Sequence, residues 1–188
     1  MRVLIAYASR YGSTEEIADR IAAILLRHGF QVTTKPVEQV RDPATYDAFV
    51  IGSATYYFHW LRRVTAFVRR NRTLLARRPV WLFSSGPLGE ESKNPDGSDK
   101  REATVPKEIA EFNATIHPRG HHVFFGALDP ARLGLGHRFI FKMIGSRDAT
   151  VLPEGDFRDW NDIESWSRSI AEDLKAPTDR PVRDSQAA

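Results

Sequence analysis

Two patterns of apolar residues alternate along the chain. Short, almost continuous apolar runs, as at residues 3–8 and 80–83, indicate strands that are buried on both faces. Between them, apolar residues recur every three or four positions, as in Ile17, Ile21 and Leu25, which is the spacing of one buried helix face. We predict strands over residues 3–8, 31–37, 46–52, 80–83 and 122–128, and helices over 14–28, 61–75, 106–116 and 160–174.

This alternation predicts an α/β fold. Strands buried on both faces that alternate with helices form a doubly wound parallel sheet with helices on both faces, here five-stranded with the order 2-1-3-4-5. In such a sheet, ligands bind beyond the carboxyl ends of the strands, where the strand order reverses. We expect one domain over residues 1–175 with an insert at about 129–150, followed by a disordered tail over 176–188.

The loop after the first strand has the residue types of a phosphate site. Its hydroxyl groups and Gly12 lie where a helix begins, and free N–H groups and the positive end of the dipole at a helix start attract an anion. Ser13 and Glu16 stand at the spacing of a capping box, which predicts that Ser13 caps this helix. The expected ligands are Ser9, Arg10, Tyr11, Gly12, Ser13 and Thr14.

Two further loops follow strands at the same edge of the sheet. The loop after the third strand is aromatic, and aromatic faces stabilise a flat ring by stacking. Alternatively, one or two of its aromatic residues begin the next helix and pack inward. The expected contacts from these loops are Ser53, Ala54, Thr55, Tyr56, Tyr57, Phe58 and His59 from the second, and Ser84, Ser85, Gly86 and Gly89 from the third.

The spacing Ser-x-Tyr-Gly-x-Thr over residues 9–14 resembles the loop with which flavodoxins bind the phosphate of flavin mononucleotide (FMN). The resemblance implies a flavodoxin-like fold and FMN as the cofactor, with a deazaflavin as the alternative, and with the flavin ring against the aromatic loop. The chain lacks the P-loop lysine and the Gly-x-Gly-x-x-Gly pattern, which disfavours nucleoside triphosphates and dinucleotides.

The C-terminal third carries a narrower resemblance. Residues 126–128, 138–144 and the pair Asp159-Trp160 are similar to the menaquinone-dependent protoporphyrinogen oxidases, a flavodoxin-like branch. This resemblance implies an FMN enzyme of haem biosynthesis that removes hydrogen from protoporphyrinogen and passes the electrons to a quinone. The flavin would supply the chemistry, and His59 is the side chain suited to move a proton, although it could equally cap a helix.

Charge and composition narrow the function further. The formal net charge is +3, no nucleic-acid motif is present, and the absence of cysteine excludes disulfides, thiolate catalysis and iron–sulfur clusters. No histidines have metal-ligand spacing, so we assign no metal. Apolar runs are too short for a signal peptide or a membrane span, and we expect a cytoplasmic protein.

Basic residues suggest where a substrate and a membrane would contact the chain. Arg62 and Arg63 lie nearest to the aromatic loop and are expected to bind the substrate's propionates, the alternative being a merely solvated helix face. Residues 131–144 mix apolar and basic side chains. They either pack on the domain or contact the inner face of the cell membrane, where a quinone dissolves.

Two other classes of function compete with the enzyme. A flavodoxin-type electron carrier has no substrate of its own, and such carriers are typically acidic around the flavin, whereas this chain is basic. A flavodoxin fold without cofactor would serve only in binding. The enzyme is the preferred interpretation, and the sequence leaves the oligomeric state open.

Overall fold

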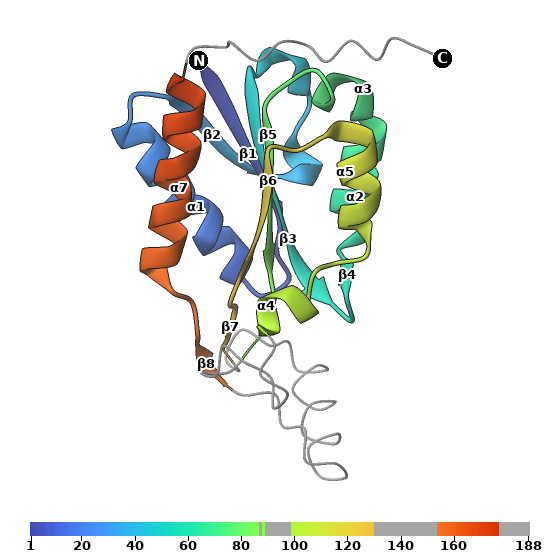
Figure 1. The fold of residues 1–188 in the computed structure, drawn as a ribbon, viewed down its shortest axis with the longest axis vertical. Coiled ribbons are helices and arrows are strands. Elements are labelled where there is room, and N and C mark those ends of the chain that lie inside the picture. Colours follow the sequence, from blue (N-terminus) through green and yellow to red (C-terminus); the bar gives the residue numbers. More distant parts are fainter. Residues whose placement is uncertain (87, 89–98, 130–153, 177–188) are drawn as a thin grey trace.

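The computed structural model describes residues 1–86, 88, 99–129 and 154–176, and it has the predicted α/β architecture (Figure 1). A parallel sheet runs through the centre in the order β2-β1-β3-β5-β6, and one short strand, β4, pairs antiparallel with β3. Without β4 this is the predicted order 2-1-3-4-5, which is confirmed. The strands are β1 (Arg2–Ala8), β2 (Gln31–Pro36), β3 (Ala48–Tyr56), β4 (His59–Trp60), β5 (Val80–Ser85) and β6 (Gly120–Phe124).

Helices cover both faces of the sheet (Figure 1). One face carries α1 (Ser13–Arg27) and α7 (Trp160–Lys175), and the other carries α2 (Arg62–Arg70), α3 (Arg72–Leu75) and α5 (Glu108–Ile116). Within the described ranges, no helix is both long and apolar enough to cross a membrane. The shorter elements are η1 (Val37–Gln39), η2 (Pro43–Thr45), α4 (Lys100–Ala103), and the two-stranded sheet of β7 (Ala127–Leu128) and β8 (Gly155–Asp156).

Strand β1 shows why the strands are continuous apolar runs. Val3 and Ile5 pack into the core under α1 and α7, whereas Leu4 and Ala6 pack into the core under α2 and α5. Successive side chains of a strand point to opposite faces, so a strand between two helical layers needs apolar residues at every position.

Two predicted elements are divided in the structure. The helix expected over 61–75 is interrupted at Asn71, whose backbone N–H and side-chain amide both donate to the carbonyl of Phe67. The strand expected over 122–128 ends at Phe124, opposite the last residue of β5, and its remainder forms β7, which pairs with β8. The pairing of β7 with β8 thus joins the segment that precedes residues 130–153 to the segment that follows them.

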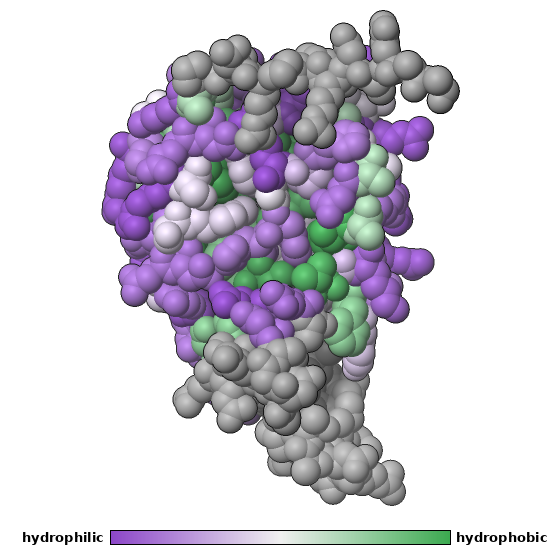
Figure 2. Space-filling model, in the orientation of Figure 1, coloured by the Kyte–Doolittle hydropathy of each residue, from purple (hydrophilic) through white to green (hydrophobic). Residues whose placement is uncertain are grey.

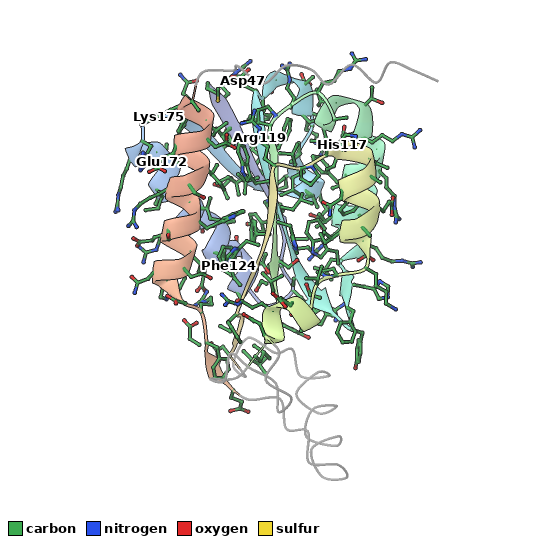
Figure 3. The ribbon with its side chains drawn as sticks, viewed as in Figure 1. Asp47, His117, Arg119, Phe124, Glu172 and Lys175 are labelled. Atoms are coloured by element: carbon green, nitrogen blue, oxygen red, sulfur yellow. The ribbon has the colours of Figure 1, made fainter. Side chains whose placement is uncertain are left out.

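Helix α7 is fixed to the sheet along its length. Phe124 points from β6 toward α7, where its ring packs against Phe83 and Trp166 (Figure 3). At the other end of β6, Arg119 lies 3.1 Å from the carboxylate of Asp173 on α7. Strand β6 lies at the edge of the sheet. Beside it, between β6 and α5, hydrophobic residues reach the surface of a face that is otherwise largely hydrophilic (Figure 2).

The packing of Gly52 on Phe83 yields a first prediction. A methyl group at Gly52 would overlap the ring of Phe83 on the neighbouring strand. We expect Gly52→Ala to lower the free energy of unfolding by about 1–3 kcal/mol, the usual cost of overpacking a core, as measured by urea denaturation. At Gly120 the added methyl would meet only an ordinary contact, 3.6 Å from Trp81. Gly120→Ala is therefore the control, and equal losses in both variants would contradict this account.

Candidate functional site

The three predicted loops meet at the carboxyl ends of β1, β3 and β5, at the lower end of the sheet in Figure 1. The hydroxyl oxygens of Ser13 and Ser85 are 3.5 Å apart, which joins the first loop to the third. A methyl group at Gly86 would lie 3.5 Å from the Cβ of Thr55, which joins the third loop to the second. The backbone N–H of Ala127 also donates to Ser13, at 3.0 Å.

The first loop begins α1 differently from the prediction. Gly12 has the left-handed φ of 93° and is itself the N-cap, with no side-chain cap, so the predicted capping box of Ser13 and Glu16 is wrong. Ser13 is instead the first helical residue, and Glu16 pairs with Arg158 at 2.7 Å. The first N–H groups of any helix lack an intrahelical partner, and because no side chain caps α1, these groups are left for a ligand.

Two buried hydroxyl groups at this edge have no partner. Thr14, at 1% exposure, lies in the first turn of α1, and Thr55 is the penultimate residue of β3. Their Oγ1 atoms are the buried side-chain polar atoms without a hydrogen bond in the part of the chain that the structure describes. Burial of an unpaired hydroxyl costs about 1–3 kcal/mol. A ligand that hydrogen-bonds both loops would remove this cost.

The second loop is a hairpin with exposed aromatic residues at its tip. Tyr57 and Phe58 have φ angles of 49° and 63° between β3 and β4, the backbone of a type I′ turn. That turn favours Asn and Gly, so each aromatic residue is strained by about 1–3 kcal/mol. Tyr57 is 92% exposed and Phe58 49% exposed. Strained and exposed rings at the edge of a ligand site are typical of a binding surface.

The other aromatic residues of the loop have different surroundings. Trp60 packs inward against Phe112, with ring centroids 5.5 Å apart, as the alternative interpretation expected of one or two aromatics. Tyr56 lies under the guanidinium of Arg10, which is 4.7 Å from its ring centroid. Burial raises the pKa of Tyr56 to about 12, so its hydroxyl remains protonated and can donate a hydrogen bond.

Several expected ligands use their hydroxyls within the protein. Ser53 Oγ donates to the carbonyl of Ala54 and accepts from the N–H of Leu61. Ser84 Oγ accepts from Trp60 Nε1 and bonds His121 Nε2, each at 2.8 Å. Through Trp60 and Leu61, these two serines therefore hold the β4 side of the hairpin against the sheet. Gly89 lies outside the described residues.

His59 and Arg63 also have protein partners. His59 Nδ1 is 2.8 Å from Glu108, on α5. Arg63 donates to the backbone carbonyl of Ser9 at 2.6 Å and pairs with Glu38 at 2.8 Å. Arg63 thus ties α2 to the first loop, a role that its position in the sequence does not indicate.

Arg158 is a residue that the sequence analysis missed. Its side chain is 7% exposed, it bonds both Glu16 and Asp156, and it stacks 4.5 Å from the ring centroid of Trp160. This contact holds the segment around β8 against the start of α1. The only signal in the sequence was the neighbouring pair Asp159-Trp160 in the narrower resemblance.

Comparison with known proteins assigns the family. The model of the family described as "Flavodoxin domain" matches residues 4–150. The chain belongs to this family. A relative from Escherichia coli strain K12, protoporphyrinogen IX dehydrogenase [quinone], is 27% identical over 185 residues, which cover 95% of this chain and 99% of the relative.

Solved structures agree in fold. A flavodoxin from the domain Archaea has a TM-score of 0.58 at 16% identity and covers 93% of this chain and 99% of its own. Rubredoxin oxygen:oxidoreductase from Desulfovibrio gigas has a TM-score of 0.59 at 17% identity, over 93% of this chain and 36% of its own. These matches confirm the predicted flavodoxin-like fold.

The family confirms FMN as the cofactor and makes the chain an FMN-dependent oxidoreductase. The residues present fit this group. FMN has a phosphate at one end and a flat ring at the other, and the site has uncapped N–H groups and Thr14 in one loop and exposed aromatic rings beside Thr55 in another.

The unpaired hydroxyl of Thr14 yields a second prediction. Thr14→Val keeps the shape of the side chain but removes its hydroxyl, so it should weaken FMN binding by about 1.5–3 kcal/mol, the range for a hydrogen bond to a charged group. The free energy of unfolding without flavin should stay equal or rise, because an unpaired buried group is lost. Titration with FMN and with riboflavin, which lacks the phosphate, checks this. Equal weakening of both flavins would contradict a phosphate contact.

His121 yields a third prediction, on pH. Burial, with a smaller effect of the charge of His122, lowers the pKa of His121 from 6.5 to about 4. The unfolded chain therefore binds a proton that the folded chain rejects between these values, and stability falls as the pH drops from 6.5 to 4, by up to about 3 kcal/mol. Urea denaturation at pH 7 and 4.5 should show a smaller drop in His121→Gln. The same drop in both proteins would refute the assignment.

Proposed function

We propose that this protein oxidises protoporphyrinogen and passes the electrons to a quinone. The observation that carries the proposal is the match to the E. coli protoporphyrinogen IX dehydrogenase, because it extends over 95% of this chain and 99% of the relative. A shared flavodoxin domain alone would suit an electron carrier as well as an enzyme. Similarity that continues beyond the family model, to the C-terminal helix, supports the more specific function.

The proposed FMN site consists of the three loops at the carboxyl edge. The N–H groups at the start of α1 and the hydroxyl of Thr14 would hold the phosphate, with Ser9, Arg10, Tyr11, Gly12 and Ser13 around it. Thr55, Tyr56, Tyr57 and Phe58 would contact the flavin ring on one side, and Ser85 and Gly86 would approach it from the third loop. Bound FMN supplies two-electron redox chemistry.

The chain's own residues would position the reactants around this cofactor. Arg63 holds the first loop through the carbonyl of Ser9, so the phosphate site keeps its shape. Tyr57 and Phe58 present rings to solvent, where an apolar substrate would lose water on binding. The hydroxyl of Tyr56, at the end of β3, remains protonated and can donate a hydrogen bond.

The proposed electron acceptor, a quinone, dissolves in the membrane, so the enzyme has to reach it there. We propose a cytoplasmic protein that contacts the membrane peripherally through residues 131–144, which lie outside the described residues. Their mixture of apolar and basic side chains suits an anionic membrane surface. Packing of this segment on the domain is the alternative.

Anaerobic half-reactions test the proposed function. FMN-loaded protein mixed with protoporphyrinogen should lose its flavin absorbance, and a menaquinone analogue should restore it. Heat-denatured protein with the same FMN is the control for direct reaction in solution. Absence of bleaching, together with rapid one-electron exchange with a ferredoxin-type reductase, would assign the protein to the electron carriers.

A further inference from the structure

A pocket is lined by residues of β4, α2 and the start of α5, three elements that lie together on one side of the sheet in Figure 1. Its volume is about 490 Å³. Trp60, Thr65 and Ala66 form its less polar wall, and the side chains with charge or a titratable ring are His59, Arg62, Arg69 and Glu108. Nothing in the proposed FMN site uses this pocket.

The charges around the pocket are unequally compensated. Arg69 forms two hydrogen bonds to Glu111, of 2.8 and 2.6 Å, and is neutralised there. Arg63, the neighbour of Arg62 in the sequence, is compensated by Glu38. The guanidinium of Arg62 lines the pocket and has no hydrogen-bond or ion-pair partner among the residues that the structure describes. One guanidinium is thus left to bind an anion.

Glu108 limits which anion fits. Burial alone would raise the pKa of Glu108, but hydrogen bonds from His59 and from the N–H of Trp60 lower it, so this carboxylate stays charged. A ligand with two negative charges would be repelled by Glu108 and attracted by one unpaired arginine only. A single carboxylate pairs well with a guanidinium, and an apolar body attached to it would lie against Trp60 and Ala66.

The pocket is next to the proposed FMN site. In the β3–β4 hairpin, Thr55 pairs with Trp60 and Tyr56 with His59. His59 and Trp60 line the pocket, and the strand partner of Trp60 is Thr55, whose buried hydroxyl is unpaired and belongs to the proposed FMN site.

We infer that this pocket is the subsite that binds one carboxylate of the reduced substrate, through Arg62. The inference rests on the proposed function and refines it, because it separates the roles of the two neighbouring arginines. Arg62 binds the substrate, whereas Arg63 positions the phosphate loop. His59, held by Glu108, is a wall of this pocket rather than a ligand of the flavin.

The test compares a free carboxylate with its ester in the FMN-loaded full chain. We expect Arg62→Gln to raise KM for protoporphyrinogen about tenfold or more, the loss expected for a charge-assisted hydrogen bond, with kcat nearly unchanged. KM for the dimethyl ester, which carries no charge, should change less than twofold. Arg70→Gln is the matched control, because Arg70 lies on the same helix but does not line the pocket.

Binding without turnover gives a second readout. The oxidised porphyrin dicarboxylate and its diester are titrated against the tryptophan fluorescence of the same proteins, since Trp60 lines the pocket. Weaker binding of the acid alone in Arg62→Gln supports the subsite. Equal effects on acid and ester, or equal effects of Arg62→Gln and Arg70→Gln, overturn it.

The two proposals fail in different ways. If the wild-type protein oxidises neither the acid nor the ester, the proposed function is wrong, and the binding titration still decides whether the pocket takes a carboxylate. If both are oxidised but Arg62→Gln discriminates between them no more than Arg70→Gln does, the enzyme stands and the subsite is wrong.

Discussion

The parallel pairing of β1, β3 and β5 is the constraint on which the site depends. In this register the last residue of β1, Ala8, lies opposite Ser53, and the last residue of β5, Ser85, lies opposite Ala54. The strands β1 and β5 thus end within one residue of each other beside β3, which continues to Tyr56 and pairs with β4. Their loops then leave the sheet side by side. The contact between Ser13 and Ser85 and the approach of Gly86 to Thr55 follow from this alignment, because neither loop has to extend far to reach the next.

The sheet and its helices can be predicted well from the sequence, because a strand that is buried on both faces needs an apolar residue at every position. The apolar runs of β1 and β5 and the helical spacing of Ile17 and Ile21 are enough to give the fold and the strand order. The loops that contain candidate ligands follow from the same argument. Strand ends are less well predicted, since the pairing of β3 with β4 and of β7 with β8 depends on contacts between separate segments.

The hydrogen bonds within the site could not be predicted, because each of these side chains has two or more possible partners and the sequence does not say which one it binds. Ser13 has the spacing of a cap, yet Gly12 adopts a left-handed φ and leaves Ser13 to accept from Ala127, which is distant in the sequence. Arg62 and Arg63 are chemically identical neighbours. Only the packing of α2 beside the first loop gives Arg63 the carbonyl of Ser9 and leaves Arg62 toward the pocket.

The two ends of the sheet differ in how fully their polar groups are satisfied, and this difference supports the location of the site. At the amino end, Asp47 accepts from the N–H of Arg2, and Arg119 pairs with Asp173 (Figure 3). At the carboxyl end, the buried hydroxyls of Thr14 and Thr55 are unpaired, and two aromatic residues occupy a strained turn. Such costs add several kcal/mol against a typical net stability of about 5–15 kcal/mol. A chain tolerates them where a bound ligand repays them, so the carboxyl edge is organised for binding at the expense of stability.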